Sequence, residues 1–334
     1  MKRGWSTLTC FFLQILTAIA VQYECLPYPV DSVCRIERIS YQSGDQISFP
    51  TGYQQYHIKV SRSLKARSSK VTVFNDKLYE AMHKPTSIEM TNTEMDELML
   101  PAELLVGDFS DNNLASVDAL QEETYQITYL DVSFNRLHHM DFVGRLVNLE
   151  ILHLERNAIG HVPGSQLSLL TKLKYLYLQF NSITWIPWSD IPRSMIHLDC
   201  YLNSVTDANF TDIDLPFLEY LNLQYNELSA INVTELLRTA PNLKEVHLYN
   251  NQIDRIQLRK IMTELTSNNI SFVDLHNWCT ADEEFNWDFD TCIQRQEESL
   301  VKIPIRQILL SITAVGSAAL FVYILVLVYR HMQR

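Results

Sequence analysis

The sequence predicts an α/β solenoid in which short parallel strands form one concave sheet, with disulfide-capped ends and a single C-terminal transmembrane helix. Three observations support this prediction. A spacing of apolar residues and asparagine recurs seven times between Leu104 and Ile253, cysteine pairs flank these repeats, and an uncharged apolar run lies near the C-terminus. We take the predicted elements in chain order.

Residues 1–20 are typical of a secretory signal peptide. Lys2 and Arg3 precede an apolar run that ends at Ala20, with small residues in the positions before a cleavage site. The alternative is a retained signal anchor, which is disfavoured because the run is short for a membrane span. We therefore expect an exported chain whose mature form starts at Val21.

Residues 21–66 form the expected N-terminal cysteine cap. Residues 25–60 alternate in polarity like a hairpin that leads into the first coil. The basic stretch between Lys59 and Lys70 is typical of a solvated strand or loop, with binding of an acidic partner as the alternative.

Residues 67–278 contain the repeats. Each clean copy has the spacing L-x-x-L-x-L-x-x-N-x-L, and first positions lie about 22 to 27 residues apart, within the range of leucine-rich repeats. Positions four and six should point inward from a short strand, and the Asn at position nine should bond backbone groups of adjacent repeats. We expect degenerate repeats at Val71–Leu78 and Ile88–Met95. The other copies are Leu104-Phe109-Asn112-Leu114, Ile127-Leu130-Val132-Asn135-Leu137, Leu149-Leu152-Leu154-Asn157-Ile159, Leu173-Leu176-Leu178-Asn181-Ile183, Met195-Leu198-Cys200-Asn203-Val205, Leu218-Leu221-Leu223-Asn226-Leu228 and Leu243-Val246-Leu248-Asn251-Ile253.

Four cysteines outside the repeats allow three pairings. About seven strand spacings of roughly 4.8 Å separate the ends of the solenoid, whereas bridged Cα atoms lie within about 7 Å. We therefore predict that Cys25 pairs with Cys34 and Cys279 with Cys292, each stapling a cap in an oxidising compartment. Cys200, at an inward position, should be a small buried hydrophobe rather than a reactive thiol.

A membrane span is expected after the last repeat. Residues 279–302 hold the C-terminal cap and an acidic juxtamembrane segment, and residues 303–329 include an uncharged run of 21 residues from Ile308 to Val328. Bases in the tail, 330–334, predict a single-pass type I protein of the plasma membrane with its repeats outside. A lipid-anchor signal is the alternative, but such signals end in their hydrophobic stretch. Three N-x-[ST] glycosylation acceptors agree with export: Asn209, Asn232 and Asn269.

The outward strand positions are the expected binding surface. Aromatic residues fill nine of the thirty outward positions in the six clean repeats, whereas they make up 10% of the chain. Tyrosines that face solvent can anchor a ligand, and the alternative is lateral packing between neighbouring strands, which can coexist with binding. The predicted ligand-binding residues are Tyr129, Phe134, His153, Arg156, Tyr175, Tyr177, Phe180, Tyr201, Tyr220, Tyr225 and Tyr249.

Several function classes are disfavoured. The charges around these residues are mixed in sign and the net charge is −12, which argues against a nucleic-acid partner. The histidines His153, His197 and His247 invite a metal site, but we favour solvated surface histidines and expect no metal or cofactor. The sequence lacks the G-x-S-x-G, H-E-x-x-H and glycine-rich phosphate-binding motifs, so we do not expect an enzyme.

The run Leu218-Glu219-Tyr220-Leu221-Asn222-Leu223-Gln224-Tyr225-Asn226, with the two cysteine pairs, resembles the extracellular leucine-rich-repeat proteins of insects. More narrowly, it resembles the mosquito leucine-rich immune proteins, in which secreted members carry a coiled coil where this chain has a predicted span. That difference fits a transmembrane subclass. The resemblance implies an innate immune receptor or co-receptor, without a signalling domain, that recognises an extracellular protein or microbial-surface ligand. Other leucine-rich-repeat proteins or a signalling co-receptor would be partners. A cell-adhesion or developmental surface protein is the alternative.

Overall fold

The computed structural model describes residues 20–26, 32–59, 70–272, 283–286 and 291–294. The chain divides into two units, Met1–Val273 and Asp274–Arg334. In the second unit the described residues form the antiparallel strands β18 (Glu283–Asn286) and β19 (Thr291–Gln294). The first unit contains the repeats.

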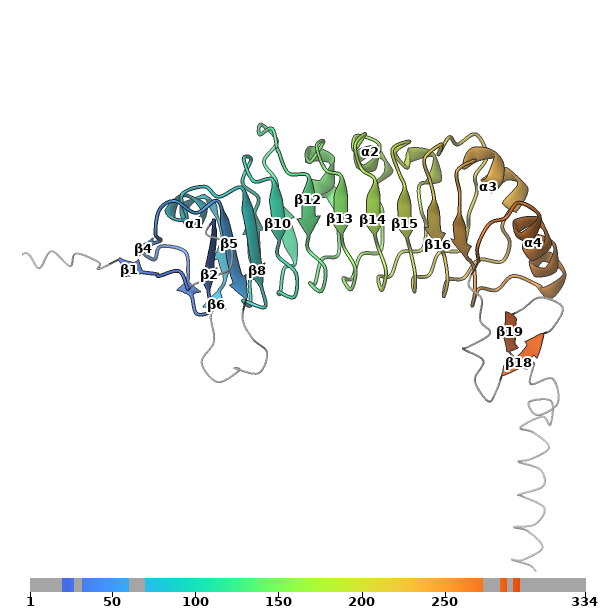
Figure 1. Cartoon of the computed structure of the whole chain (residues 1–334), viewed down its shortest axis with the longest axis horizontal. Coiled ribbons are helices and arrows are strands. Elements are labelled where there is room, and N and C mark those ends of the chain that lie inside the picture. The colour runs from blue at the N-terminus through green and yellow to red at the C-terminus, as the bar shows by residue number, and fades with distance from the viewer. Residues whose placement is uncertain (1–19, 27–31, 60–69, 273–282, 287–290, 295–334) are drawn as a thin grey trace, which may run out of the picture. The chain divides into compact units, whose positions relative to one another are not determined.

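A ten-stranded parallel sheet is the main element of the first unit (Figure 1). Its strands pair in chain order and in register, so that equivalent inward residues such as Leu152, Leu176 and Leu198 lie side by side and are fully buried. The leucine-rich-repeat fold is thereby confirmed. The strands are β2 (Val33–Ile36), β5 (Gln55–Lys59), β8 (Ser87–Thr91), β10 (Val106–Asp108), β12 (Tyr129–Asp131), β13 (Ile151–His153), β14 (Tyr175–Tyr177), β15 (His197–Asp199), β16 (Tyr220–Asn222) and β17 (Glu245–His247).

The segments that return the chain from one strand to the next form short helices and small sheets. Figure 1 shows α2 and α3 along one side of the strands. The helices are α1 (Asp76–Ala81), α2 (Gly164–Leu167), α3 (Val233–Thr239) and α4 (Arg255–Ser267), with 3-10 helices η2 (Asp141–Arg145) and η3 (Trp188–Asp190). The small parallel sheets are β1 (Val21–Gln22) with β4 (Ile47–Ser48), β3 (Ser40–Tyr41) with β6 (Lys70–Val71), and β7 (Val73–Phe74), β9 (Glu97–Met99) and β11 (Ser116–Asp118).

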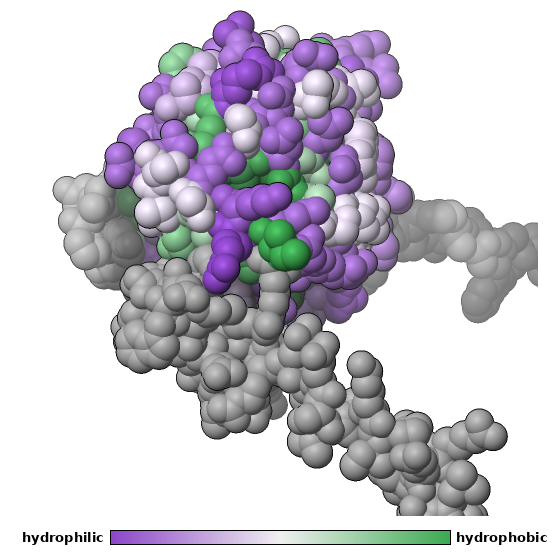
Figure 2. Space-filling view, turned by 90° about the vertical axis from the view of Figure 1, so that its right-hand side faces the viewer, coloured by the Kyte–Doolittle hydropathy of each residue, from purple (hydrophilic) through white to green (hydrophobic). Residues whose placement is uncertain are grey.

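The last of these return segments ends in α4, whose N-terminus is capped by Asp254 through the amides of Ile256 and Gln257. Ile261 and Leu265 of this helix are buried in the apolar core. The surface at this end of the unit is largely hydrophilic, with hydrophobic residues gathered near its centre (Figure 2). Helix α4 therefore contributes to burying the last layers of the core.

The expected asparagine ladder is confirmed. Asn157 accepts a hydrogen bond at Oδ1 from the amide of Leu137 at 2.9 Å, and its Nδ2 donates to the carbonyls of Val132 and Leu154 at 3.0 Å each. One side chain therefore satisfies backbone groups of two repeats. The same set of bonds recurs at Asn135, Asn181, Asn203, Asn226 and Asn251.

The residue before each ladder asparagine adopts the left-handed conformation, with φ between 52° and 56° in Phe134, Arg156, Phe180, Leu202 and Tyr225. For a residue other than glycine this conformation costs roughly 1 to 2 kcal/mol. The hydrogen bonds of the following asparagine offset that cost, because they hold the turn closed.

The N-terminal region differs from the predicted hairpin. β2 and β5 pair in parallel, with Cys34 opposite Tyr56, and both belong to the main sheet. The hairpin prediction was wrong because the alternating runs belong to a coil of the solenoid: Ile47–Ser48 forms β4, which pairs in parallel with β1, and Tyr56 fills an inward position normally held by leucine. Cys25 and Cys34 form the predicted disulfide, with their Cα atoms 4.9 Å apart. The bond joins the segment before β2 to the first strand of the sheet.

One of the two degenerate repeats is confirmed. β8 covers the start of Ile88–Met95 and lies in the main sheet. Val71–Leu78 instead spans the end of β6, β7 and the start of α1, in a return segment. Phe74 and Leu78 are fully buried from that side of the core, so their apolar spacing marks packing of a return segment rather than a sheet strand.

The looser copy at Leu104 also has a physical reason. Gly107 stands in β10 where other repeats have an inward leucine. A Cβ at Gly107 would lie 2.8 Å from the ring of Phe109, so the phenylalanine at position six occupies the space that a leucine would need.

Several predictions fall outside the described residues. They concern the signal peptide, the span at 303–329, the tail and the partner of Cys292, since Cys279 lies outside these ranges. Within the ranges that the structure describes, no helix has the length and apolar character needed to cross a membrane. The pairing of Cys279 with Cys292 stays a prediction.

Candidate binding face

The candidate site is the open face of the main sheet, defined as the side chains at positions three, five, seven and eight of the repeats from β12 to β17. Positions three and five flank the buried residue of each strand, and positions seven and eight lie in the turn that follows. All eleven residues predicted from the sequence lie on this face, and each is half-buried or exposed.

Tyrosine and histidine rings alternate across the six strands in what we call the Tyr–His ladder. The rings of His153 and Tyr177 stack with centroids 4.2 Å apart, and those of His197 and Tyr220 stack at 4.1 Å. Tyr177 and His197 join the two pairs at 4.9 Å. Tyr129 and His247 extend the ladder at its two ends, at 5.6 and 5.2 Å from their neighbours.

A second row, the turn ladder, runs beside the first through positions seven and eight. The guanidinium of Arg156 lies 5.2 Å from the ring centre of Phe134 and 3.9 Å from that of Phe180, which gives two cation–π contacts. Phe180 then contacts Tyr201 at 5.3 Å between ring centres. Tyr225 and Tyr249 continue the row with edge-to-face contacts at 5.2 and 5.8 Å.

Carboxylates accompany the histidines. Nδ1 of His153 lies 2.8 Å from Oε1 of Glu155, and Nε2 of His247 lies 2.5 Å from Oε1 of Glu245. Burial alone would lower the pKa of His153, but the hydrogen bond to Glu155 and the nearby carboxylates raise it above the usual value. His197 has no such partner for Nε2. Burial lowers the pKa of His197 to about 4.

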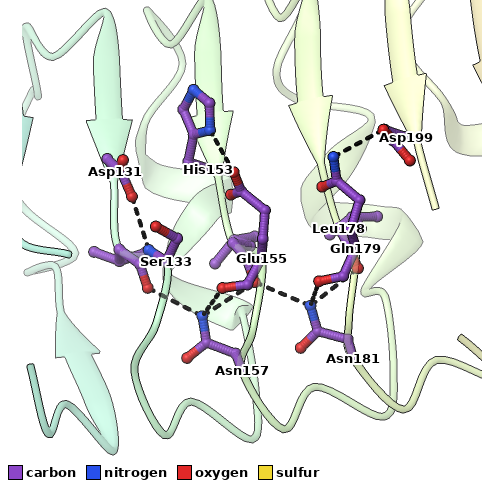
Figure 3. Close-up of polar contacts among 11 residues, drawn as sticks. Asp131, Ser133, His153, Glu155, Asn157, Leu178, Gln179, Asn181 and Asp199 are labelled. Atoms are coloured by element: carbon purple, nitrogen blue, oxygen red, sulfur yellow. Dashed lines mark hydrogen bonds and ion pairs between the residues drawn. The ribbon is translucent and has the colours of Figure 1, made fainter. Parts of the chain in front are cut away.

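The pKa values of two aspartates on the open face are also shifted. Burial raises the pKa of Asp131, although hydrogen bonds from Ser133 partly offset that effect. Burial likewise raises the pKa of Asp199, which accepts hydrogen bonds from the amide of Tyr201 and from Gln179. Figure 3 shows Asp131 in the repeat of β12 and Asp199 in that of β15, with Glu155 and Gln179 from the two repeats between them. A nearby cation would favour the charged form of both carboxyls.

Two histidines of the ladder were missed by sequence reasoning. His197 and His247, like His153, were interpreted as solvated surface residues, whereas all three are half-buried and lie against tyrosine rings, and only His153 was predicted to bind the ligand. The spacing held a signal, because His197 stands at position three between Tyr175 and Tyr220, and His247 stands at position five beside a repeat with Tyr220 at position three. Within the described ranges, no group of three or more His, Cys, Asp or Glu side chains could hold a metal ion.

The remaining predicted residues lie elsewhere on the first unit. Cys200 is fully buried, and burial raises the pKa of its thiol far above the usual value, as expected for an inert core residue. The acceptors Asn209, Asn232 and Asn269 are all exposed. Asn232 also caps α3 through the amide of Glu235, and Asn269 ends the α4 segment in the left-handed conformation. Their glycosylation stays a prediction.

Comparison with known proteins agrees with this architecture. Residues 125–183 match the family model described as leucine rich repeat. Opticin of Bos taurus is 31% identical over 153 residues, which cover 44% of this chain and 44% of opticin. Lumican of Homo sapiens is 26% identical over 196 residues, 51% of this chain and 57% of lumican. Podocan-like protein 1 of Mus musculus is 34% identical over 105 residues, 31% of this chain and 15% of that protein.

Solved structures show the same fold. A chain of the octameric complex of latrophilin 3, Unc5D and FLRT2 has a TM-score of 0.53 at 17% identity, covering 75% of this chain and 86% of that one. The functional domain of InlJ from Listeria monocytogenes has a TM-score of 0.50 at 19% identity, covering 71% and 47%.

The chain is therefore a leucine-rich-repeat protein, similar over its repeats to lumican, opticin and podocan-like protein 1. Its matched part spans at most 57% of the length of these three relatives. The prediction of a non-enzymatic binding protein agrees with these comparisons.

Proposed function

We propose that this chain is an extracellular binding protein that recognises a protein or microbial-surface ligand through its open face, as an innate immune receptor or co-receptor. The observation that carries the proposal is the pair of ring ladders across β12 to β17, because solvent-facing tyrosines in such number are typical of interface anchors. The lateral packing of the same rings does not exclude binding, since each ring remains partly accessible.

An extracellular location is supported by the Cys25–Cys34 disulfide, because such bonds persist in oxidising compartments. The single-pass type I arrangement in the plasma membrane, with residues 303–329 as the span, is part of the same proposal. So is the immune role implied by the resemblance to mosquito leucine-rich immune proteins.

The test compares two variants of the full chain. Tyr177→Ala with Tyr201→Ala removes one member of each ladder, and Leu169→Ala removes a side chain that is 53% exposed in a return segment. Binding to a panel of extracellular-fluid proteins and whole microbial cells is measured beside thermal melting. We expect the tyrosine variant to melt near the parent and to lose a ligand that the leucine variant retains.

If the tyrosine variant binds every ligand as well as the parent, the open face is not the recognition site. A ligand found only on neighbouring cells of the same organism would instead favour a cell-adhesion role.

A further inference from the structure

The charges of the open face are sorted by position. Positions three, five and seven from β8 to β17, all within the described residues, hold six carboxylates and neither lysine nor arginine. The six are Glu89, Asp108, Asp131, Glu155, Asp199 and Glu245. The strands place several of them side by side, since Glu89 pairs in register with Asp108, and Asp108 with Asp131.

The bases near this surface are already engaged. Lys174 and Lys244, at position two, form ion pairs of 2.6 and 2.7 Å with Glu150 and Glu219. Arg156 lies between two phenylalanine rings of the turn ladder. Arg35 of β2, which is aligned with position five of the following repeats, pairs with Glu37 at 3.3 Å. The mixed charge expected from the sequence thus separates into paired bases beside a row of carboxylates, three of which, Glu89, Glu155 and Glu245, contact histidines.

The centre of this face also holds hydrogen-bond acceptors with no donor. Oε2 of Glu155 and Oε1 of Gln179 are buried and lack a partner, while the other polar atom of each side chain is engaged, by His153 and Asp199 respectively. The two residues occupy position seven of adjacent repeats and point into the same region of the face (Figure 3). An unpaired buried acceptor is costly, so a ligand that brings N–H donors would gain from meeting them.

The rings suit a cationic donor as well. Arg156 shows that a guanidinium fits between aromatic rings of this surface, 3.9 Å from one of them. Tyrosines of the two ladders flank the acceptors and offer similar contacts to the stem and head of a second cation.

We propose that the open face binds an extended cationic polypeptide segment, whose lysine or arginine side chains donate to Glu155, Gln179 and the flanking Asp131 and Asp199. The inference rests on the proposed function and names the chemistry of its ligand. Successive acceptors lie one strand apart, about 4.8 Å, so a segment laid across six strands spans about 24 Å, or about seven extended residues. Anionic polymers and acidic lipid surfaces are excluded from this face by like-charge repulsion.

The first experiment uses the full chain and three labelled decapeptides in which glycine alternates with arginine, glutamine or glutamate. Fluorescence anisotropy should show binding of the arginine peptide alone, and the affinity should fall as ionic strength rises from about 0.05 to about 0.5 M. Equal binding of the arginine and glutamate peptides would overturn the proposal, and so would no binding of the arginine peptide.

The second experiment tests whether binding depends on these particular carboxylates or on the net charge of the protein. Asp131→Asn with Glu155→Gln keeps an oxygen to accept from Ser133 and His153, so the turns retain their hydrogen bonds. Glu227→Gln makes the same kind of change at an exposed position off the face. The double variant should weaken binding of the arginine peptide by at least about tenfold, and Glu227→Gln by less than about twofold.

Equal losses in the two variants would show non-specific charge attraction and refute the site. The proposed function would fail separately, through the tyrosine variant. If Tyr177→Ala with Tyr201→Ala loses a natural ligand while the arginine peptide never binds, the open face remains the binding site and only its cationic ligand is wrong.

Discussion

Replacing Asn226 by alanine tests the asparagine ladder most directly. This side chain is 6% exposed, and its Oδ1 accepts from the amide of Val205 at 2.9 Å. Its Nδ2 donates to the carbonyls of Cys200 and Leu223 at 3.0 and 3.2 Å. Alanine would leave the buried amide of Val205 without its partner, whereas the carbonyls of Cys200 and Leu223 would keep one donor each, from Asn203 and Asn251. At about 1 to 3 kcal/mol for one unsatisfied buried amide, with a smaller contribution from the two lost bonds to the carbonyls, we expect a loss of about 2 to 3 kcal/mol.

The assay is equilibrium urea unfolding followed by circular dichroism, with Asn242→Ala as the matched control. Asn242 is exposed and makes one hydrogen bond, to the carbonyl of Pro216 at 2.6 Å. Its loss should change the free energy of unfolding by less than about 1 kcal/mol. If Asn226→Ala unfolds at the same urea midpoint and slope as the parent, the ladder contributes no stability and the reasoning fails.

Three further predictions follow from the same contacts. The pKa of His197 is lowered to about 4, from an unfolded value of about 6.5. The free energy of unfolding should therefore fall by about 1 to 3 kcal/mol as the pH drops from about 6.5 to about 4. Melting measured at several pH values should show a weaker pH dependence for His197→Phe. Leu176→Ala, at a fully buried position, should cost about 2 to 5 kcal/mol in urea unfolding, and an unchanged midpoint would contradict the packing described. Cys25→Ser opens a bond between residues 9 apart and should cost about 2 to 3 kcal/mol; equal melting of parent and variant under oxidising conditions would count against a stabilising cap.

The repeated part of the fold was predictable because its determinants are local. Within one repeat, the residues at positions four, six and nine fix which side chains are buried and where the backbone needs an amide partner, as Leu152, Leu154 and Asn157 show. The nearby pair Cys25 and Cys34 was predictable for the same reason, since only closely spaced cysteines fit the geometry of the caps.

The N-terminal strands were not predictable from this pattern. β2 and β5 keep a buried isoleucine at position six, Ile36 and Ile58, but they use Cys34 and Tyr56 at position four and lack the asparagine. Their burial is decided by stacking of β2 on β5 and of β5 on β8, and the paired residues of β5 and β8 lie more than thirty positions apart in the sequence. The repeat pattern alone does not encode those contacts.

The candidate site was predicted as a set of residues but not as an arrangement. Ring contacts such as His197 with Tyr220 join positions on neighbouring strands, so they depend on the register of the sheet and on side-chain direction. The sorting of charge depends on the same register. Lys174 could be counted as a free base of the face from sequence, but Glu150 of the preceding repeat neutralises it at 2.6 Å.

Packing of the rings and recognition of a ligand are linked by geometry. His153 with Tyr177, and His197 with Tyr220, lie nearly parallel, with interplanar angles of 7° and 2°. Each ring therefore covers one face of its partner, and that face cannot stack on a flat ligand. The stacked pairs instead present their polar edges and the adjacent carboxylates in a fixed row. The sheet holds this row in place, because the ladder asparagines close its turns. A surface ordered before binding loses little entropy when a ligand arrives, and a ligand that uses charge and hydrogen bonds gains most from it.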